Sequence, residues 1–369
     1  MGRTSWHPAK VRQRGAPGRI VQAPARLDRD LHTPPAKTTR SGAIHELVGV
    51  AGPLPARSPL PPRQLPERKA VLCVDLEYLL VSLYVLVDEW WQETHPPTPK
   101  KAGRPPSLSA SEVLTLAVLA QWPRWRSERD FWRFADVHLR GYFPNLLSHG
   151  QLNRRIRALE PELRALQRDL ARTLTDGSEV YHVLDTTLIP AIVRVRASRK
   201  GLFAGQATFG RCVSKTEWVY GFKVALSVTP EGVIAAFGLA EANSDERPIG
   251  EFLLTSDGHD AFLADNEFSS IAWEKHWLEE HGALVAATPQ KSAGRAWPEA
   301  VCRWAAGKRQ FIEGVIWQLK DYFGLERHRA KSLGGLLTRL AAKVAAYTVG
   351  QVLNERLGRP LRGFAELLI

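Results

Sequence analysis

The chain has 369 residues, 44% of them apolar, which is enough for two domains with cores of their own. Its net charge of +12 favours an anionic partner such as nucleic acid or a membrane surface. No run of roughly 18 apolar residues is free of charge, which excludes a transmembrane helix, and no N-terminal apolar segment indicates a signal peptide. The three cysteines are too far apart for a disulfide framework or a zinc motif, so we expect a reducing cytosol.

Residues 1–70 differ in composition from the rest of the chain. They contain thirteen lysines and arginines, four acidic residues and eleven prolines. A segment of this kind can bury little apolar surface, so we expect it to be disordered. Two interpretations stay open: a basic arm that binds DNA loosely, or a non-native extension from an upstream start codon.

Helices are predicted between residues 71 and 174, where apolar residues recur at helical spacing. Ser109 and Glu112 form a capping box at the start of the second helix. The last helix is rich in arginine and is interrupted at Pro161. The set suits a DNA-binding module or an ordinary helical bundle with a solvated arginine face. The predicted helices cover residues 71–91, 110–121, 131–139 and 148–174.

From residue 180 the pattern changes to strands, and residues 218–229 alternate apolar and polar side chains over a long run. The predicted order is three strands, helix, strand, helix, strand and two helices. This order predicts an α/β fold, a mixed sheet covered by helices. The elements are strands 180–184, 218–229, 233–239, 261–264 and 283–288, and helices 245–254, 271–280, 308–322 and 333–353.

Two aspartates follow predicted strands. Asp185 comes after strand 180–184, and Asp265 comes after strand 261–264. Charged residues at strand ends lie at the rim of a sheet, where functional side chains gather. Each aspartate also has a structural interpretation, a cap in a turn for Asp185 and the N-cap of the next helix for Asp265.

A third acidic residue, Glu313, lies on the predicted helix 308–322. Arg309 precedes it by four residues and Lys320 follows it by seven, so all three share one face of the helix. This stripe has two interpretations. It is a solvated set of salt bridges, or it is a metal-ligating glutamate beside cations that hold a polyanion. Ile312 and Leu319 lie on the opposite, apolar face.

An ordered set of motifs resembles the DDE-type transposases of bacterial insertion sequences, members of the RNase H-like superfamily. The resemblance covers roughly residues 71–360 and includes the signature Tyr-(2)-Arg-(3)-Glu-(6)-Lys, with Ala306 at the tyrosine position. Another departure is Glu267 after Asp265, where a small residue is commoner. The motifs are Asp185 in His-Val-Leu-Asp-Thr-Thr, the basic block 194–199, Ser214-Lys215, Tyr220-Gly-Phe-Lys223, Asp265, and Arg309 with Glu313 and Lys320.

The resemblance implies an RNase H-like mixed sheet flanked by helices and preceded by a helical N-terminal domain. We expect a disordered extension at 1–70, a helical, DNA-binding domain at 71–176 and a catalytic domain at 177–369. It also implies DNA transposition and recombination in the bacterial cytoplasm, in association with the nucleoid. The implied partners are double-stranded DNA, as terminal inverted repeats and as target, and a second copy of the chain in an active homodimer.

For the site, the resemblance implies that Asp185, Asp265 and Glu313 are catalytic and bind metal. Phosphodiester cleavage develops negative charge on two oxygens, which two Mg²⁺ ions stabilise when they are about 3.5–4 Å apart. Mg²⁺ prefers oxygen ligands, and Mn²⁺ is expected to substitute for it. We expect Asp185 to bridge the ions because its strand is central. Asp245, at the start of a predicted helix, is expected to support the site without being a ligand.

Several cations are predicted to bind DNA. Arg309 would hold a phosphate as a bidentate fork and Lys320 as a point charge. A second group alternates with aromatic side chains that could stack on unpaired bases, although a solvated hairpin with core aromatics fits the same pattern. This group contains Arg194, Arg196, Arg199, Lys215 and Lys223.

Other functions receive less support from the sequence. It has no glycine-rich phosphate loop, no His-Glu-x-x-His and no Gly-x-Ser-x-Gly, which counts against ATP-driven and zinc-dependent chemistry. A degenerate transposase that only binds DNA is one alternative, although its three carboxylates would be expected to drift. A metal-dependent nuclease that only hydrolyses DNA is another, because it needs the same carboxylates.

Overall fold

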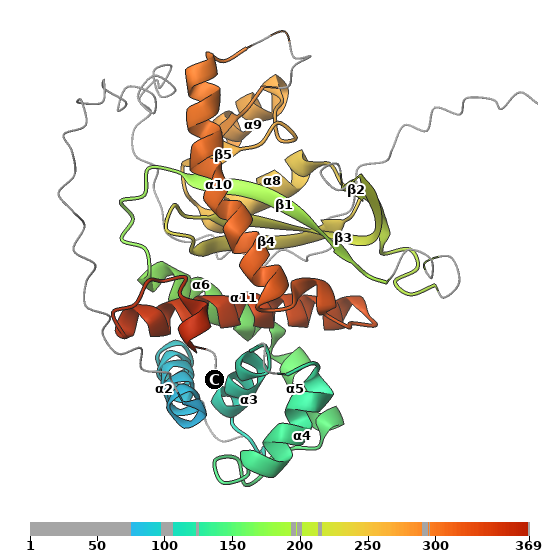
Figure 1. Ribbon diagram of the computed structural model, residues 1–369, viewed down its shortest axis with the longest axis vertical. Coiled ribbons are helices and arrows are strands. Elements are labelled where there is room, and N and C mark those ends of the chain that lie inside the picture. The colour runs from blue at the N-terminus through green and yellow to red at the C-terminus, as the bar shows by residue number, and fades with distance from the viewer. Residues whose placement is uncertain are drawn as a thin grey trace, which may run out of the picture.

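The computed structural model describes residues 75–96, 106–122, 125–192, 197, 201–212, 216–289, 294 and 296–367. The predicted disordered extension at residues 1–70 lies outside this part of the chain. Within it, the structure is a mixed β-sheet with helices on both faces and a group of helices below it (Figure 1).

The sheet has six strands, and the long strand β3 pairs with three of the others. β3 pairs antiparallel with β1 over residues 221–228, with β4 over residues 222–228 on its other edge, and with β2 over residues 217–221. β1 then pairs parallel with β5, and β5 with β6, which gives the order β2-β3-β1-β5-β6 with β4 beside β3. The strands are β1 His182–Pro190, β2 Thr208–Cys212, β3 Glu217–Val228, β4 Ile234–Glu241, β5 Ala261–Ala264 and β6 Leu284–Ala287.

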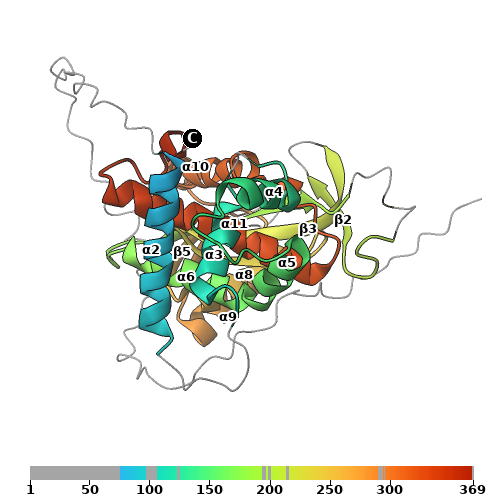
Figure 2. The same cartoon turned by 90° about the horizontal axis from the view of Figure 1, so that it is seen from below.

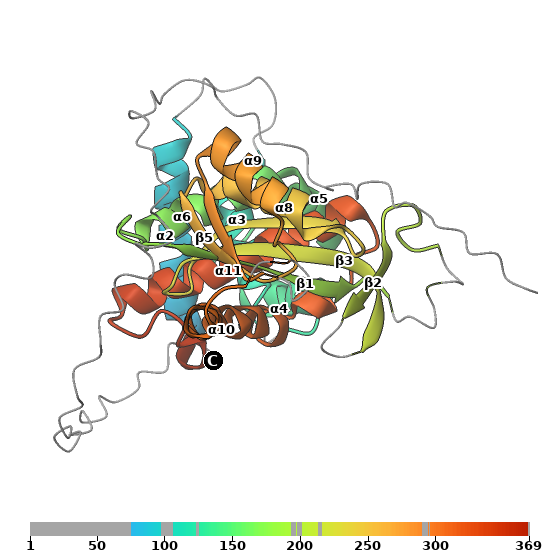
Figure 3. The ribbon, with the colours of Figure 1, turned by 90° about the horizontal axis from the view of Figure 1, so that it is seen from above.

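Helices cover both faces of the sheet, each over an apolar core. Helices α8 (Glu246–Asp257) and α9 (Ile271–His281) cover one face, and α10 (Glu299–Asp321) crosses the other (Figure 3). Alternate strand residues enter the two cores: Leu184 packs on the α8 side, whereas its neighbour Val183 packs on the α10 side. The predicted RNase H-like α/β fold is confirmed.

The buried helix α11 (Leu333–Arg356) joins the sheet to the N-terminal helices, which lie across it (Figure 2). Its Tyr347 hydroxyl and Gln351 amide both donate to the carbonyl of Gly232, in the turn between β3 and β4, at 3.0 and 2.9 Å. The predicted domain boundary at residue 176 stays a prediction. The N-terminal helices are α2 Leu76–Thr94, α3 Ala110–Leu119, α4 Glu128–His138, α5 His149–Ala158 and α6 Glu160–Thr173. Short 3₁₀ helices cover Leu325–Arg327 (η1) and Phe364–Leu367 (η2).

Local sequence signals placed most elements correctly. The capping box at Ser109 is present, and strand β5 has the predicted bounds. Three predictions were wrong: β1 continues to Pro190, strand β2 was missed, and α10 begins at Glu299, well before Lys308. Pairing with β3 extends β1 through a polar run that has no strand pattern of its own. No helix in the described residues combines the length and apolar character needed to cross a membrane.

Gly221 offers a test of the crowded junction where β3 meets β1 and β2. A Cβ atom there would lie 2.1 Å from the carbonyl oxygen of Ile189 and 2.7 Å from the amide of Ala191. Gly221→Ala should therefore destabilise the fold by about 1–3 kcal/mol or more, as overpacking does. Gly150→Ala is the control, because open space surrounds this α5 position and the change should be neutral or slightly stabilising. Thermal melting checks both, and equal melting temperatures for the two variants would contradict the described junction.

Candidate active site

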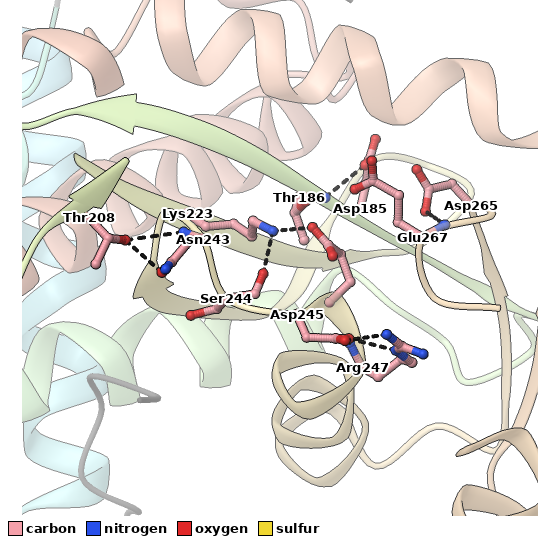
Figure 4. Close-up of polar contacts among 11 residues, drawn as sticks. Asp185, Thr186, Thr208, Lys223, Asn243, Ser244, Asp245, Arg247, Asp265 and Glu267 are labelled. Atoms are coloured by element: carbon pink, nitrogen blue, oxygen red, sulfur yellow. Dashed lines mark hydrogen bonds and ion pairs between the residues drawn. The ribbon is translucent and has the colours of Figure 1, made fainter. Parts of the chain in front are cut away.

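The parallel register of β1 and β5 places Asp185, which lies within β1, next to Asp265, which follows β5. Val183 of β1 pairs with Leu263 of β5. Asp185 lies two residues after Val183, and Asp265 lies two residues after Leu263. Hydrogen bonds orient both carboxylates: Asp185 Oδ1 accepts from the amide of Thr186 at 2.7 Å, and Asp265 Oδ1 from the amide of Glu267 at 2.9 Å (Figure 4). Asp265 does not cap the next helix, since Ser270 is the N-cap of α9.

Helix α10 brings Glu313 and Arg309 to these aspartates. The guanidinium Nη2 of Arg309 lies 3.9 Å from Asp265 Oδ2, and the negative charge of Glu313 acts on Asp185. On a neighbouring side of the helix, Ile312 and Leu319 are buried in the core, as predicted, and fix its position. The fold therefore gathers the three predicted carboxylates.

The two aspartates lie in a poorly solvated and negatively charged place. Burial, and then the charges of Asp265 and Glu313, raise the pKa of Asp185 to about 7, against the opposing charge of Arg309. Burial also raises the pKa of Asp265, again opposed mainly by Arg309. The positive charge of Arg309 alone therefore does not balance the negative charge of the carboxylates, whereas a bound divalent cation would add the missing positive charge.

Two further glutamates join the site, and the sequence analysis assigned them no role. Burial, and then the charge of Glu246 and a hydrogen bond with it, raise the pKa of Glu267 to about 7. Asp265 adds to this effect. In the sequence, Glu246 directly follows Asp245, and Glu267 follows Asp265 by two residues. This closeness to predicted site residues was the one signal that could have indicated their place in the site.

Lys223 was predicted to contact DNA, but in the structure its side chain makes contacts within the protein. Its side chain is buried, and its Nζ donates to the carbonyl of Ser244 at 2.7 Å and forms an ion pair with Glu246 (Figure 4). Lys223 is paired with Leu188 in the sheet and points toward α8. The amine is thus held between the sheet and the start of α8. The other predicted cations of this group, Arg194, Arg196, Arg199 and Lys215, lie outside the described residues.

The remaining predicted residues have local partners. Lys320 Nζ lies 2.8 Å from Glu326 Oε1, on the segment that follows α10. Asp245 begins α8, as predicted: its carboxylate accepts from the amide of Arg247 at 2.9 Å and pairs with the side chain of that residue.

A separate set of potential metal ligands lies on α8 and α9. Glu251 Oε1 is 2.8 Å from His276 Nε2 and 3.0 Å from His281 Nε2. Among the described residues, this is the one group of three whose donor atoms all lie within 4.8 Å of one another. Asp185, Asp265 and Glu313 are spaced more widely, as expected for carboxylates that repel one another.

Comparison with known proteins points to one family. Residues 176–333 match the family model described as "Transposase DDE domain", and this segment includes β1, β5 and α10 with all three carboxylates. Phosphodiester transfer is the chemistry of such domains. A solved structure, the Mos1 transposase paired-end complex with left transposon end, is similar at 13% identity over 73% of this chain and 86% of that chain, with a TM-score of 0.19. That likeness is too weak to argue from. No curated protein matches the chain.

The raised pKa of Asp185 predicts a pH-dependent gain in stability for Asp185→Asn in EDTA. The ordinary carboxyl pKa of 3.8 becomes about 7 in the folded chain. The contribution of Asp185 to wild-type stability should therefore fall between about pH 4 and pH 7, because this group ionises first in the unfolded chain, and then stay level. Asparagine does not ionise, so the variant's advantage in melting temperature should be near zero at about pH 4 and largest above about pH 7.

The control for this experiment is Asp245→Asn, which should change stability in the opposite direction. Although partial burial opposes it, hydrogen bonds from Arg247 lower the pKa of Asp245, so ionised Asp245 stabilises the fold. Its loss should therefore cost stability as the pH rises. A difference between Asp185→Asn and the wild type that does not vary with pH would contradict the electrostatics described here.

Proposed function

We propose that the protein is a transposase that cleaves DNA and transfers strands at the ends of an insertion sequence. The proposal rests on one observation. Asp185 and Asp265 lie two residues beyond the last parallel pair of β1 and β5, and Glu313 approaches them from α10. All three lie in the segment that matches the Transposase DDE domain. Its partners would be double-stranded DNA, as transposon ends and as target, and a second copy of the chain.

Asp185, Asp265 and Glu313 fit Mg²⁺ as ligands, because all three offer hard carboxylate oxygens and their charges are under-compensated. Mn²⁺ would substitute for it. Two bound ions would supply activation of the attacking hydroxyl and stabilisation of the leaving oxygen. Glu267 and Glu246 lie close enough to Asp265 to add to the negative potential that attracts cations.

Arg309 is suited to hold a phosphate beside the carboxylates. Its Nη2 already lies near Asp265, while its buried Nε has no hydrogen-bond partner among the described residues. A guanidinium with an unused donor can bind two phosphate oxygens as a fork. Lys223 would act differently, as a positioning residue whose ion pair with Glu246 fixes the start of α8 beneath the site.

Amide substitutions test the catalytic role of the carboxylates. Asp185→Asn, Asp265→Asn and Glu313→Gln should each reduce Mg²⁺-dependent cleavage to background and leave DNA binding nearly intact. An amide keeps the shape of the side chain but loses the charge that ligates a metal. The substrate is a duplex that carries the DNA flanking the reading frame, and cleavage and joined products are measured on a gel.

Glu279→Gln is the matched control for these variants, because it removes the charge of an exposed carboxylate on α9 that is paired with Lys275 and has no part in the site. It should keep wild-type cleavage. Near wild-type cleavage by any one of the three amide variants would remove that residue from the catalytic set. Cleavage without joined products would favour a nuclease that only hydrolyses DNA.

The predicted phosphate contacts of Arg309 and Lys320 are tested by salt titration of binding to the same duplex. For each lost phosphate contact, the slope of log affinity against log salt should fall by roughly 0.9. Arg309→Ala and Lys320→Ala should each show that change. Arg309→Lys should also lower the affinity for the duplex, because a point charge cannot replace the bidentate contact of a guanidinium. Lys320→Arg should lower this affinity less than Arg309→Lys does.

Lys275→Ala provides the reference, since Lys275 is an exposed cation on α9, over the other face of the sheet. Its slope should equal that of the wild type. If Arg309→Ala and Lys320→Ala also keep the wild-type slope, both residues are structural ion-pair partners, of Asp265 and Glu326 respectively.

A further inference from the structure

A second strongly charged site lies away from the carboxylates. A cavity of about 570 Å³ opens between the end of α3, the start of α4, the segment after α10, and α11. Seven lysine and arginine side chains line it, against the carboxylates of Glu128 and Asp321. A volume of this size is typical of pockets that hold a small organic ligand rather than a single ion.

The segment after α10 presents a row of cations to this cavity. Arg327, Arg329 and Lys331 are exposed, and they alternate with buried His328 and Ala330. His328 anchors the row, because its Nε2 donates to the carbonyl of Pro190 and its Nδ1 accepts from the amide of Ala330, both at 3.0 Å. Arg329 has a φ of 52°, a costly left-handed conformation for a residue with a side chain. The backbone of this segment is therefore strained at Arg329, in a conformation in which all three cations line the cavity.

Helix α11 adds two cations at the base of the cavity. Arg339 binds both carboxylate oxygens of Glu128, at 2.7 and 2.6 Å. Lys343 is buried and donates to the carbonyl of Phe323, and it forms no ion pair with a carboxylate of the described residues. Its pKa is lowered to about 8, first by burial and then by Arg339 and Arg327, although Glu128 opposes this. The protein's own carboxylates therefore do not balance the positive charge here.

Some other groups in the lining have no partner within the described part of the chain. Among the described residues, Arg126, Arg129, Arg329 and Lys331 form no ion pair. The indole Nε1 of Trp125, another lining residue, is buried without an acceptor in the same part of the chain. Free cations suit phosphate oxygens, and an aromatic ring with an unused donor suits a nucleobase.

The cavity lies at the ends of the two elements that hold carboxylates. Pro190 ends β1 five residues after Asp185, and Asp321 ends α10 eight residues after Glu313. At roughly 3.3 Å per strand residue and 1.5 Å per helix residue, both separations are about 12–17 Å. DNA covers that length in about four to five base pairs, at a rise of roughly 3.4 Å per pair.

We propose that this pocket binds one nucleotide of a DNA strand that also passes the carboxylate site, with its phosphate on the cation row and its unpaired base against Trp125. The proposal rests on the proposed function, which supplies DNA as the ligand. It goes further by assigning a second contact to a site formed jointly by the N-terminal helices and the last helices of the chain.

The first test is a salt titration of binding for the double variant Arg329→Ala, Lys331→Ala. The probe is a fluorescent duplex with a single-stranded extension, in EDTA, so that no cleavage occurs. Both side chains are exposed, and alanine substitution leaves the fold's core untouched. The slope of log affinity against log salt should fall by roughly one to two units, whereas Lys275→Ala should keep the wild-type slope. A double variant with the wild-type slope would overturn the proposal.

The second test locates the base. Extensions that carry 5-iodouracil are irradiated with the full-length protein, and crosslinked peptides are identified by mass spectrometry. A crosslink to the peptide with Trp125 is expected, and it should disappear in the Arg329→Ala, Lys331→Ala variant. Crosslinks confined to peptides that do not line the cavity would place the base elsewhere.

A third arm separates DNA from free phosphate. Inorganic phosphate is titrated into the wild type and the double variant, and melting temperatures are measured. Stabilisation of the wild type alone, combined with an unchanged salt slope for DNA, would make the cavity a site for a small anion and overturn the DNA assignment. None of the three assays measures cleavage, so a failure of the catalytic proposal would leave these results unaffected.

Discussion

The parallel pairing of β1 with β5 is the constraint on which the site depends. On β1 only His182 and Val183 take part in this pairing, yet it places Asp185 next to Asp265. A slip by one residue would turn Asp185 or Asp265 to the opposite face of the sheet, away from α10. The β1–β3 ladder, which runs from Val183 to Pro190, holds the register of the short parallel pair. The long antiparallel β1–β3 ladder thus stabilises the register of the short parallel β1–β5 ladder.

The carboxylates are gathered at an electrostatic cost that the fold offsets elsewhere. Burial and mutual repulsion raise the pKa values of Asp185, Asp265 and Glu267, while Arg309 and Lys223 give partial compensation from opposite faces of the sheet. The two apolar cores hold these segments in place despite the repulsion. Such a site favours a multivalent cation, because any bound positive charge relieves several unfavourable interactions together.

Sequence reasoning worked where signals are local and stopped where they depend on tertiary packing. Caps and turns marked the start of α3 and the bounds of β5. β1 was predicted too short because Asp185-Thr186-Thr187 has no strand pattern, and β3 supplies the pairing that extends it. Lys223 illustrates the same limit. Alternation along the strand placed it on one face, but only the packing of α8 decides that this face is buried.

If the protein acts on DNA as proposed, the separation of charge along α10 would bring the DNA to acidic groups. A phosphate that approaches Asp185, Asp265 and Glu313 alone is repelled by them. Cations at the far end of α10, about 12–17 Å away by the lengths of β1 and α10, attract other phosphates of the same strand. Attraction at a remote, non-reacting part of a substrate can offset repulsion at the reacting part. In the proposed function, the cationic cavity and the carboxylate site would therefore act on one DNA strand with opposite charges, and α10 would set the distance between them.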